Sequence, residues 1–200
     1  GIFLHSVFKN FFGIKTFFTG HAIKSNNNEE ILREQELFNE VWLYSNFEKN
    51  IYIEECNYKI NNLVTTGYPR LDSLNKLIGS KSEIKNILKI NSKIVLYAPT
   101  DDRKNKKYIQ NHLSPHNLDL YRFFENVAKK LNLKFLIKLH INTQLNEDIK
   151  NYIKNSKHLI SSDEINNYPD ITPLAISDML ITDWSSIFVD YLITKKSILL

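Results

Sequence analysis

The sequence is poor in cysteine, glycine and arginine, and each shortage excludes a class of protein or site. The single cysteine, Cys56, excludes an intrachain disulfide and a cysteine-rich zinc centre, so a reducing compartment fits the chain best. The five glycines cannot be assembled into a G-x-G-x-x-G loop, a P-loop or a G-x-S-x-G nucleophile elbow. Any phosphate site in this chain must therefore be built from other groups.

Long apolar runs are missing as well. No stretch reaches the roughly 18 residues that a membrane-spanning helix needs. The apolar and aromatic segment 1–18 lacks a basic leader and a small-residue cleavage site, so it is not interpreted as a signal peptide. Leu199 and Leu200 end the sequence inside an apolar run, from which we expect the chain to be cut through a buried element.

The composition is that of a globular chain with a mild excess of positive charge. Of the 200 residues, 42% are hydrophobic and 24% are charged, which excludes a disordered tail or a fibrous repeat. The net charge is +4, and the strongest basic run, 103–107, adjoins Asp101 and Asp102. Because no segment interleaves Lys and Arg with aromatics, we predict a solvated loop there and no nucleic-acid partner. Contact with anionic lipid headgroups stays open.

Short apolar runs alternate with segments of helical periodicity along most of the chain. The predicted strands are 15–18, 41–44, 63–66, 94–98, 135–139, 158–160, 179–182 and 197–200. The predicted helices are 119–131, 145–153, 173–179 and 186–194, of which the last is nearly all apolar and is expected to be buried on most sides. Such alternation predicts an α/β fold with parallel sheets, in which ligands bind beyond the carboxyl ends of the strands. A polar connection predicts a domain boundary near residues 78–92.

Polar side chains follow three of the predicted strands. Ser185 and Ser186 open a helix and are suited to its N-cap, where unpaired N–H groups favour a phosphate; a capped helix without ligand is the alternative. Lys138 lies near the end of a second strand, after Leu136 and Ile137, and His140 follows that strand. A cation there can stabilise a leaving phosphate, although a lone histidine is more often structural. The third strand is followed by a hydroxyl and a guanidinium, on Thr100 and Arg103.

Two further features lie in the first half of the chain. His21 follows an apolar strand and is suited to proton transfer near neutral pH, with a surface-loop histidine as the alternative. Gly67 and Pro69 form a turn that enters a helix, and Arg70 and Asp72 are placed to pair with each other and fix that turn.

Five motifs in this order resemble the CDP-glycerol glycerophosphotransferases of teichoic acid and capsule synthesis. The most specific block is S-D-M-L-I-T-D-W-S-S-I-F-V-D-Y at 177–191, close to the family pattern S-D-x-L-I-T-D-Y-S-S-x-x-x-D-Y. The others are the histidine motif at 20–24, T-G-Y-P-R-L-D at 66–72, L-Y-A-P-T at 96–100 with Arg103 nearby, and I-K-L-H at 137–140.

The resemblance implies a GT-B architecture: two Rossmann-like domains facing a cleft, truncated at both ends in this sequence. Residues 1–85 would be the C-terminal part of the acceptor-side domain, and 86–200 the donor-binding domain, incomplete at its C-terminus. The implied reaction moves glycerol phosphate, or a related polyol phosphate such as ribitol phosphate, from a CDP-activated donor to a hydroxyl of a lipid-linked polymer or primer, and CMP leaves. The implied location is cytoplasmic, peripheral on the inner face of the membrane. No cofactor and no metal is implied.

The resemblance also assigns roles residue by residue. His21 matches the base toward the acceptor hydroxyl, and His140 matches the histidine near the donor pyrophosphate. The donor and phosphate-binding set is Thr100, Arg103, Lys138, Thr182, Ser185, Ser186 and Asp190. The structural motif near the cleft is Gly67, Pro69, Arg70 and Asp72.

Three departures keep alternatives open. Ala22 stands where the family usually has glycine, Ile141 stands where it has proline, and the spacing to Arg103 is one residue longer. A sugar-nucleotide glycosyltransferase on the same scaffold is one alternative. A non-catalytic fragment that binds nucleotide without turnover is the other.

Overall fold

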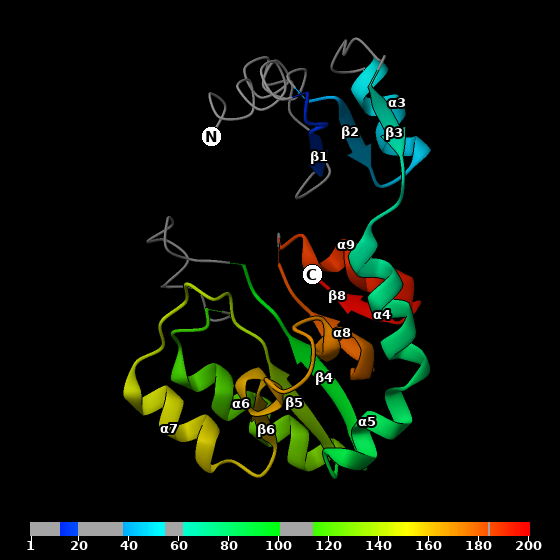
Figure 1. Cartoon of the computed structure of the whole chain (residues 1–200). Helices are drawn as coiled ribbons and strands as arrows, with labels where there is room; N and C mark the ends of the chain where they lie inside the picture. Colours follow the sequence, from blue (N-terminus) through cyan, green and yellow to red (C-terminus); the bar gives the residue numbers. More distant parts are fainter. Residues whose placement is uncertain (1–12, 20–37, 55–61, 101–113, 184) are drawn as a thin grey trace. The chain divides into compact units, whose positions relative to one another are not determined.

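The computed structural model (Figure 1) describes residues 13–19, 38–54, 62–100, 114–183 and 185–200. Its two compact units are Gly1–Pro69 and Arg70–Leu200. The division falls earlier in the sequence than the expected boundary at 85/86, because helices α4 (Pro69–Gly79) and α5 (Lys81–Ile87) bury Leu74 and Ile84 in the core of the second unit. The assignment of acceptor and donor sides to the two parts of the chain stays a prediction.

The first unit contains a three-stranded parallel sheet in the order β1 (Phe17–Thr19), β2 (Glu40–Leu43), β3 (Leu63–Thr65). Helix α3 (Asn46–Glu54) packs on β2 and β3 and buries Tyr52 against them. Its Glu48 carboxylate is 1% exposed and accepts the Tyr44 N–H at 2.6 Å. Burial raises the pKa of Glu48, although the bond from Tyr44 opposes that shift. The three strands expected in this half are confirmed.

The second unit contains a five-stranded sheet whose strands all run parallel. The spatial order is β6-β5-β4-β7-β8, so the chain starts in the middle and builds outward on both sides. The strands are β4 (Lys93–Tyr97), β5 (Leu133–Ile137), β6 (Leu159–Ser161), β7 (Met179–Ile181) and β8 (Ser197–Leu199). The predicted α/β class with parallel sheets is confirmed, and every strand expected in this half is present.

Helices cover both faces of the second sheet (Figure 1). Along β4, Ile94 and Leu96 face one hydrophobic core while Val95 and Tyr97 face the other, as the two-residue period of a strand requires. The first core contains side chains of α4, α5, α8 (Thr172–Ile176) and α9 (Ile187–Tyr191), and the second contains side chains of α6 (Leu118–Leu131) and α7 (Glu147–Asn155). Burial on both faces explains why these strands are continuous apolar runs.

The predicted helix over 186–194 forms, but its expected burial is wrong. The segment is divided into α9 and a 3₁₀ turn, η3 (Leu192–Thr194). Only Asp190 and Tyr191 are buried within it, and Leu192 is 58% exposed. The segment precedes the edge strand β8, so one side of it packs against the sheet, which an apolar composition alone does not reveal.

Asp178, directly before β7, holds the amino end of that strand to β4. One carboxylate oxygen accepts the Ile94 N–H at 2.9 Å, and the other accepts the Lys81 ammonium at 2.5 Å. Burial by itself raises the Asp178 pKa, but the bonds from Lys81 and Ile94 outweigh it and hold the pKa below its usual value. The carboxylate is therefore a stabilising group at neutral pH.

We expect Asp178→Asn to lower the free energy of unfolding by about 2 kcal/mol at pH 7, because charge-assisted bonds are lost at both oxygens. Urea denaturation of the whole chain measures this difference. A carboxylate with a depressed pKa stabilises above its unfolded-state pKa, so the difference should shrink as the pH falls below about 4. Glu83→Gln on the exposed side of α5 is the matched control, and equal losses in both variants would contradict the role of Asp178.

Candidate functional site

The candidate site lies at the carboxyl edge of the second sheet, where the loops after β4, β5 and β7 meet. Asp183, after β7, accepts the Thr100 N–H at 2.8 Å and also accepts the Thr100 hydroxyl. Thr182 is buried, and its hydroxyl donates to the Ala98 carbonyl at 2.6 Å. These bonds fix the two loops relative to each other and bring together two of the predicted site residues, Thr100 and Thr182.

Lys138 extends this edge beyond β5. Its N–H donates to the Tyr97 carbonyl at 2.9 Å, which keeps the chain in register one residue past the strand. Its ammonium forms an ion pair with Asp170, whose side chain is 92% exposed. A cation is thus held at the edge by a solvent-facing partner. Sequence reasoning missed this partner, as it missed Asp183, because neither carboxylate is adjacent in sequence to the group it binds.

His140 lies two residues further along and is exposed. Its Nδ1 accepts the Asn142 backbone N–H at 3.3 Å and lies 3.1 Å from the Asn142 side-chain nitrogen. A backbone N–H can only donate, so Nδ1 is the acceptor in this contact. Donation from the other ring nitrogen, Nε2, to a phosphate stays a prediction.

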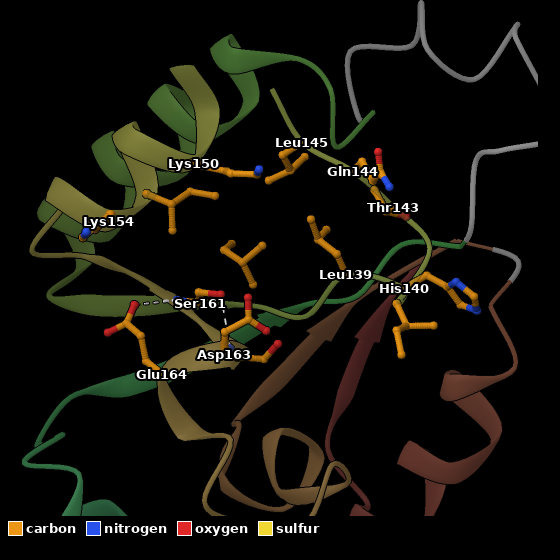
Figure 2. A pocket seen from close by; sticks show the side chains of 14 residues that line it. Leu139, His140, Thr143, Gln144, Leu145, Lys150, Lys154, Ser161, Asp163 and Glu164 are labelled. Atoms are coloured by element: carbon orange, nitrogen blue, oxygen red, sulfur yellow. Dashed lines mark hydrogen bonds between the residues drawn. The ribbon is translucent and has the colours of Figure 1, made fainter. Parts of the chain in front are cut away.

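A cavity of about 830 Å³ opens beside His140, between the loop after β5, helix α7 and the 3₁₀ helix η2 (Ser162–Ile165) (Figure 2). Apolar side chains form part of its lining, and polar and charged side chains form the rest. The apolar part includes Ile137, Leu139, Leu145 and Ile153, and the polar part includes Thr143, Gln144, Lys150, Lys154 and Asp163. This volume lies within the ~300–1,000 Å³ range of small-molecule sites.

The loop after β7 leads to Ser185 and Ser186, both partly exposed, at the start of α9. Ser186 occupies the N-cap position, as expected from its residue type, but its side chain makes no capping bond. The helix is held instead by backbone bonds, in which Ser186 O accepts the Val189 N–H at 3.1 Å. The Ser186 hydroxyl is therefore not committed to the cap, and its predicted phosphate role stays a prediction.

Asp190 is buried and pairs with Arg70 across α9 and α4, at 3.1 Å between carboxylate and guanidinium. The expected pair was Arg70 with Asp72, and the local pattern gave no sign of this long-range partner. The turn before α4 is as predicted: Gly67 has φ +73°, which favours glycine, and Pro69 is the first residue of the helix. A buried carboxylate paired with Arg70 fixes α9, and its predicted role at donor phosphates stays a prediction.

Two predicted site residues, His21 and Arg103, lie outside the described residues. Among the residues that the structure does describe, no group of three or more His, Cys, Asp or Glu side chains is arranged to hold a metal ion. No helix in the same ranges is long and apolar enough to cross a membrane.

Comparison with known proteins gives a consistent family likeness. The family model for CDP-glycerol:poly(glycerophosphate) glycerophosphotransferase matches residues 14–200. The chain is 32% identical over 154 residues to the teichoic acid glycerol-phosphate primase of Bacillus subtilis strain 168, covering 75% of this chain and 36% of that protein. It is 31% identical over 141 residues to the teichoic acid poly(glycerol phosphate) polymerase of Bacillus spizizenii, covering 68% and 34%.

The solved structure of the wall teichoic acid polymerase TagF superposes with a TM-score of 0.57 at 25% identity, covering 85% of this chain and 40% of that one. This likeness confirms the GT-B-like fold class expected from the motifs. The chain spans about a third of the length of the two curated relatives.

We expect Thr100→Val to cost about 1 kcal/mol of unfolding free energy, because the hydroxyl bond to Asp183 is lost while the N–H bond remains. Thr143→Val is the matched control, since the buried Thr143 hydroxyl has no hydrogen-bond partner within the described part of the chain and its removal should cost nothing. Chemical denaturation measures both changes. A larger loss in the Thr143 variant would contradict the assigned geometry.

For the Arg70–Asp190 pair, we expect Asp190→Asn to cost about 1 kcal/mol, because the Arg70 guanidinium loses its counter-charge but is 36% exposed and can be solvated by water. The double variant Arg70→Met with Asp190→Asn should cost clearly less than the sum of the two single changes. Additive losses in this double-mutant cycle would show that the two side chains do not stabilise each other.

Proposed function

Because this chain belongs to the CDP-glycerol:poly(glycerophosphate) glycerophosphotransferase family, we propose that it serves the transfer of glycerol phosphate from CDP-glycerol to a hydroxyl of a teichoic-acid-like polymer or primer. The acceptor oxygen attacks the phosphorus that carries glycerol, the bond from that phosphorus to the CMP oxygen breaks, and the acceptor proton goes to a base. The observation that carries the proposal is His140 at the rim of a cavity, on the same sheet edge as Thr100, Lys138 and Thr182.

The donor occupies the carboxyl edge of the second sheet. The cavity beside α7 receives the nucleoside, with apolar walls against the ring and Thr143, Gln144 and Asp163 near its polar edge. The pyrophosphate lies toward His140 and Lys138, where Nε2–H and ammonium stabilise the charge that builds up on the leaving CMP. The hydroxyls of Ser185 and Ser186 contribute further donors from the loop after β7.

His21 acts as the base toward the acceptor hydroxyl, and Arg103 assists at the phosphates; both assignments rest on the motifs in which these residues stand. The acceptor is a lipid-linked polymer or primer, and the protein binds peripherally to the inner face of the membrane, as the net charge of +4 favours. A ribitol phosphate donor would use the same pyrophosphate contacts, so the choice of polyol depends on contacts beyond them.

We expect His140→Ala to lower the rate of CMP release from CDP-glycerol by about 100-fold, because a donor to the developing charge is lost. The assay uses the intact protein with a glycerol-phosphate primer. His158→Gln is the control, since His158 directly precedes β6 at the opposite edge of the sheet. Unchanged turnover in the His140 variant would show that this residue has no role in the mechanism. Turnover of UDP- or GDP-sugars in place of CDP-glycerol would show that the protein is a glycosyltransferase instead.

A further inference from the structure

The amino edge of the second sheet carries a cluster of lysines that the proposed transfer reaction does not use. Lys81 and Lys85 come from one face of α5, and Lys196 comes from the residue before β8. These three residues with Asp178 are called here the lysine cluster. Because all five strands are parallel, this edge is the one opposite to His140 and the donor cavity.

The contacts of the lysine cluster are well defined. The Lys81 ammonium lies 2.5 Å from Asp178 and the Lys85 ammonium lies 4.0 Å from it, with both lysine side chains largely buried. The Lys196 ammonium donates to the carbonyls of Ser177 at 2.5 Å and Ala175 at 3.3 Å. The Lys81 ammonium also donates to the Ser177 carbonyl at 3.3 Å, and the Lys85 ammonium donates to the Ser92 carbonyl at 2.7 Å. Among the described residues, Lys81 and Lys85 form ion pairs with Asp178 alone, and Lys196 forms no ion pair.

The cluster therefore holds more positive charge than its own groups neutralise. Two ammonium groups pair with one carboxylate, and the third, on Lys196, is held by carbonyls only. The setting is partly desolvated, so the like charges repel more strongly than in water. Burial, with the neighbouring Lys81 ammonium as the next cause, lowers the pKa of Lys196 to about 8. An anion placed among these groups would relieve that repulsion.

A second basic feature lies at the same edge, where α5 leads into β4 at the bottom of Figure 1. A cavity of about 410 Å³ has ten lining residues, among them three lysines, Lys89, Lys134 and Lys157, and also Glu164, which lines the donor cavity as well. Most of the other lining residues are apolar. The Glu164 carboxylate accepts the Ser161 N–H at 3.0 Å, so it is committed to a helix cap. The basic cavity lies by the amino ends of β4, β5 and β6, and the lysine cluster lies by those of the neighbouring strands β7 and β8.

We infer that the amino edge of the second sheet binds the phosphate groups of a phosphodiester chain, with the lysine cluster and the basic cavity holding successive phosphates. Lysine is a point-charge binder of phosphate, and several lysines along an edge suit a polyanion better than a single small ion. The identity of the bound phosphodiester as a glycerol phosphate polymer rests on the proposed function. The binding of phosphate groups at the amino edge is argued independently of that function. The polymer made at one edge would then be retained at the other.

The test uses the whole chain without any CDP-glycerol, so its outcome is independent of the transfer reaction. Long-chain polyphosphate serves as the phosphate polyanion and inorganic phosphate as the single anion, with ionic strength held constant by sodium chloride. Binding is measured by calorimetry and by the shift in melting temperature. We expect polyphosphate to bind at least about tenfold more tightly per phosphate than inorganic phosphate, with an affinity that falls as salt rises.

The variants are chosen to keep Asp178 paired with Lys81. Lys85→Gln, Lys196→Gln and Lys134→Gln should each weaken polyphosphate binding several-fold, while Lys76→Gln on the exposed face of α4 should leave it unchanged. Amine acylation at pH 8 measures directly whether polyphosphate occupies the lysine cluster. Polyphosphate should slow the labelling of Lys196 and leave that of Lys76 unaltered, because a nearby anion raises the Lys196 pKa and depletes the free amine.

Three results would overturn the inference. Equal affinity per phosphate for the two probes would reduce the edge to a small-anion site. If Lys76→Gln weakened polyphosphate binding as much as the Lys85, Lys196 and Lys134 variants do, the binding would depend on the total charge and not on this edge. Binding to phosphatidylglycerol vesicles with no binding of polyphosphate would assign the edge to a membrane surface instead.

Discussion

Strand β7 is held to the central strand β4 by a carboxylate at each end, and the candidate site depends on this double attachment. Asp178 receives the Ile94 N–H before the strand begins, and Asp183 receives the Thr100 N–H after it ends. The loops that carry Thr100, Thr182 and the two serines are placed by these bonds. The motif that identifies the family most specifically thus joins two strands through its first two aspartates, Asp178 and Asp183.

The parallel sheet separates two kinds of electrostatic environment. At the carboxyl edge, the described cation Lys138 pairs with the exposed Asp170. At the amino edge, lysines gather around the Asp178 carboxylate and around the carbonyls at the carboxyl end of α8, where the helix dipole favours cations. A small-molecule donor and a long anionic chain therefore meet different surfaces of the same unit.

Local patterns predicted the elements well and their long-range partners poorly. Continuous apolar runs identified the strands because each is buried on both faces, and the α6 and α7 periodicities identified their helices. The partner of Arg70 could not be predicted from the sequence, because Asp190 is distant in sequence whereas Asp72 is only two residues away. The burial of 186–194 was overestimated because apolar composition does not say which strand lies at a sheet edge. The contact of His140 Nδ1 with Asn142 could not be predicted, because it follows from loop geometry rather than residue type.

The double attachment of β7 constrains the length of its segment more than its chemistry. Between Asp178 and Asp183 the register to β4 pairs Met179, Leu180 and Ile181 one to one with Val95, Leu96 and Tyr97. Side chains inside the strand can be replaced by other apolar side chains of similar size, because they only make apolar contacts. Adding or deleting one residue would leave one of the two aspartates out of step with its N–H partner. In evolution this segment should accept substitutions but no insertions or deletions.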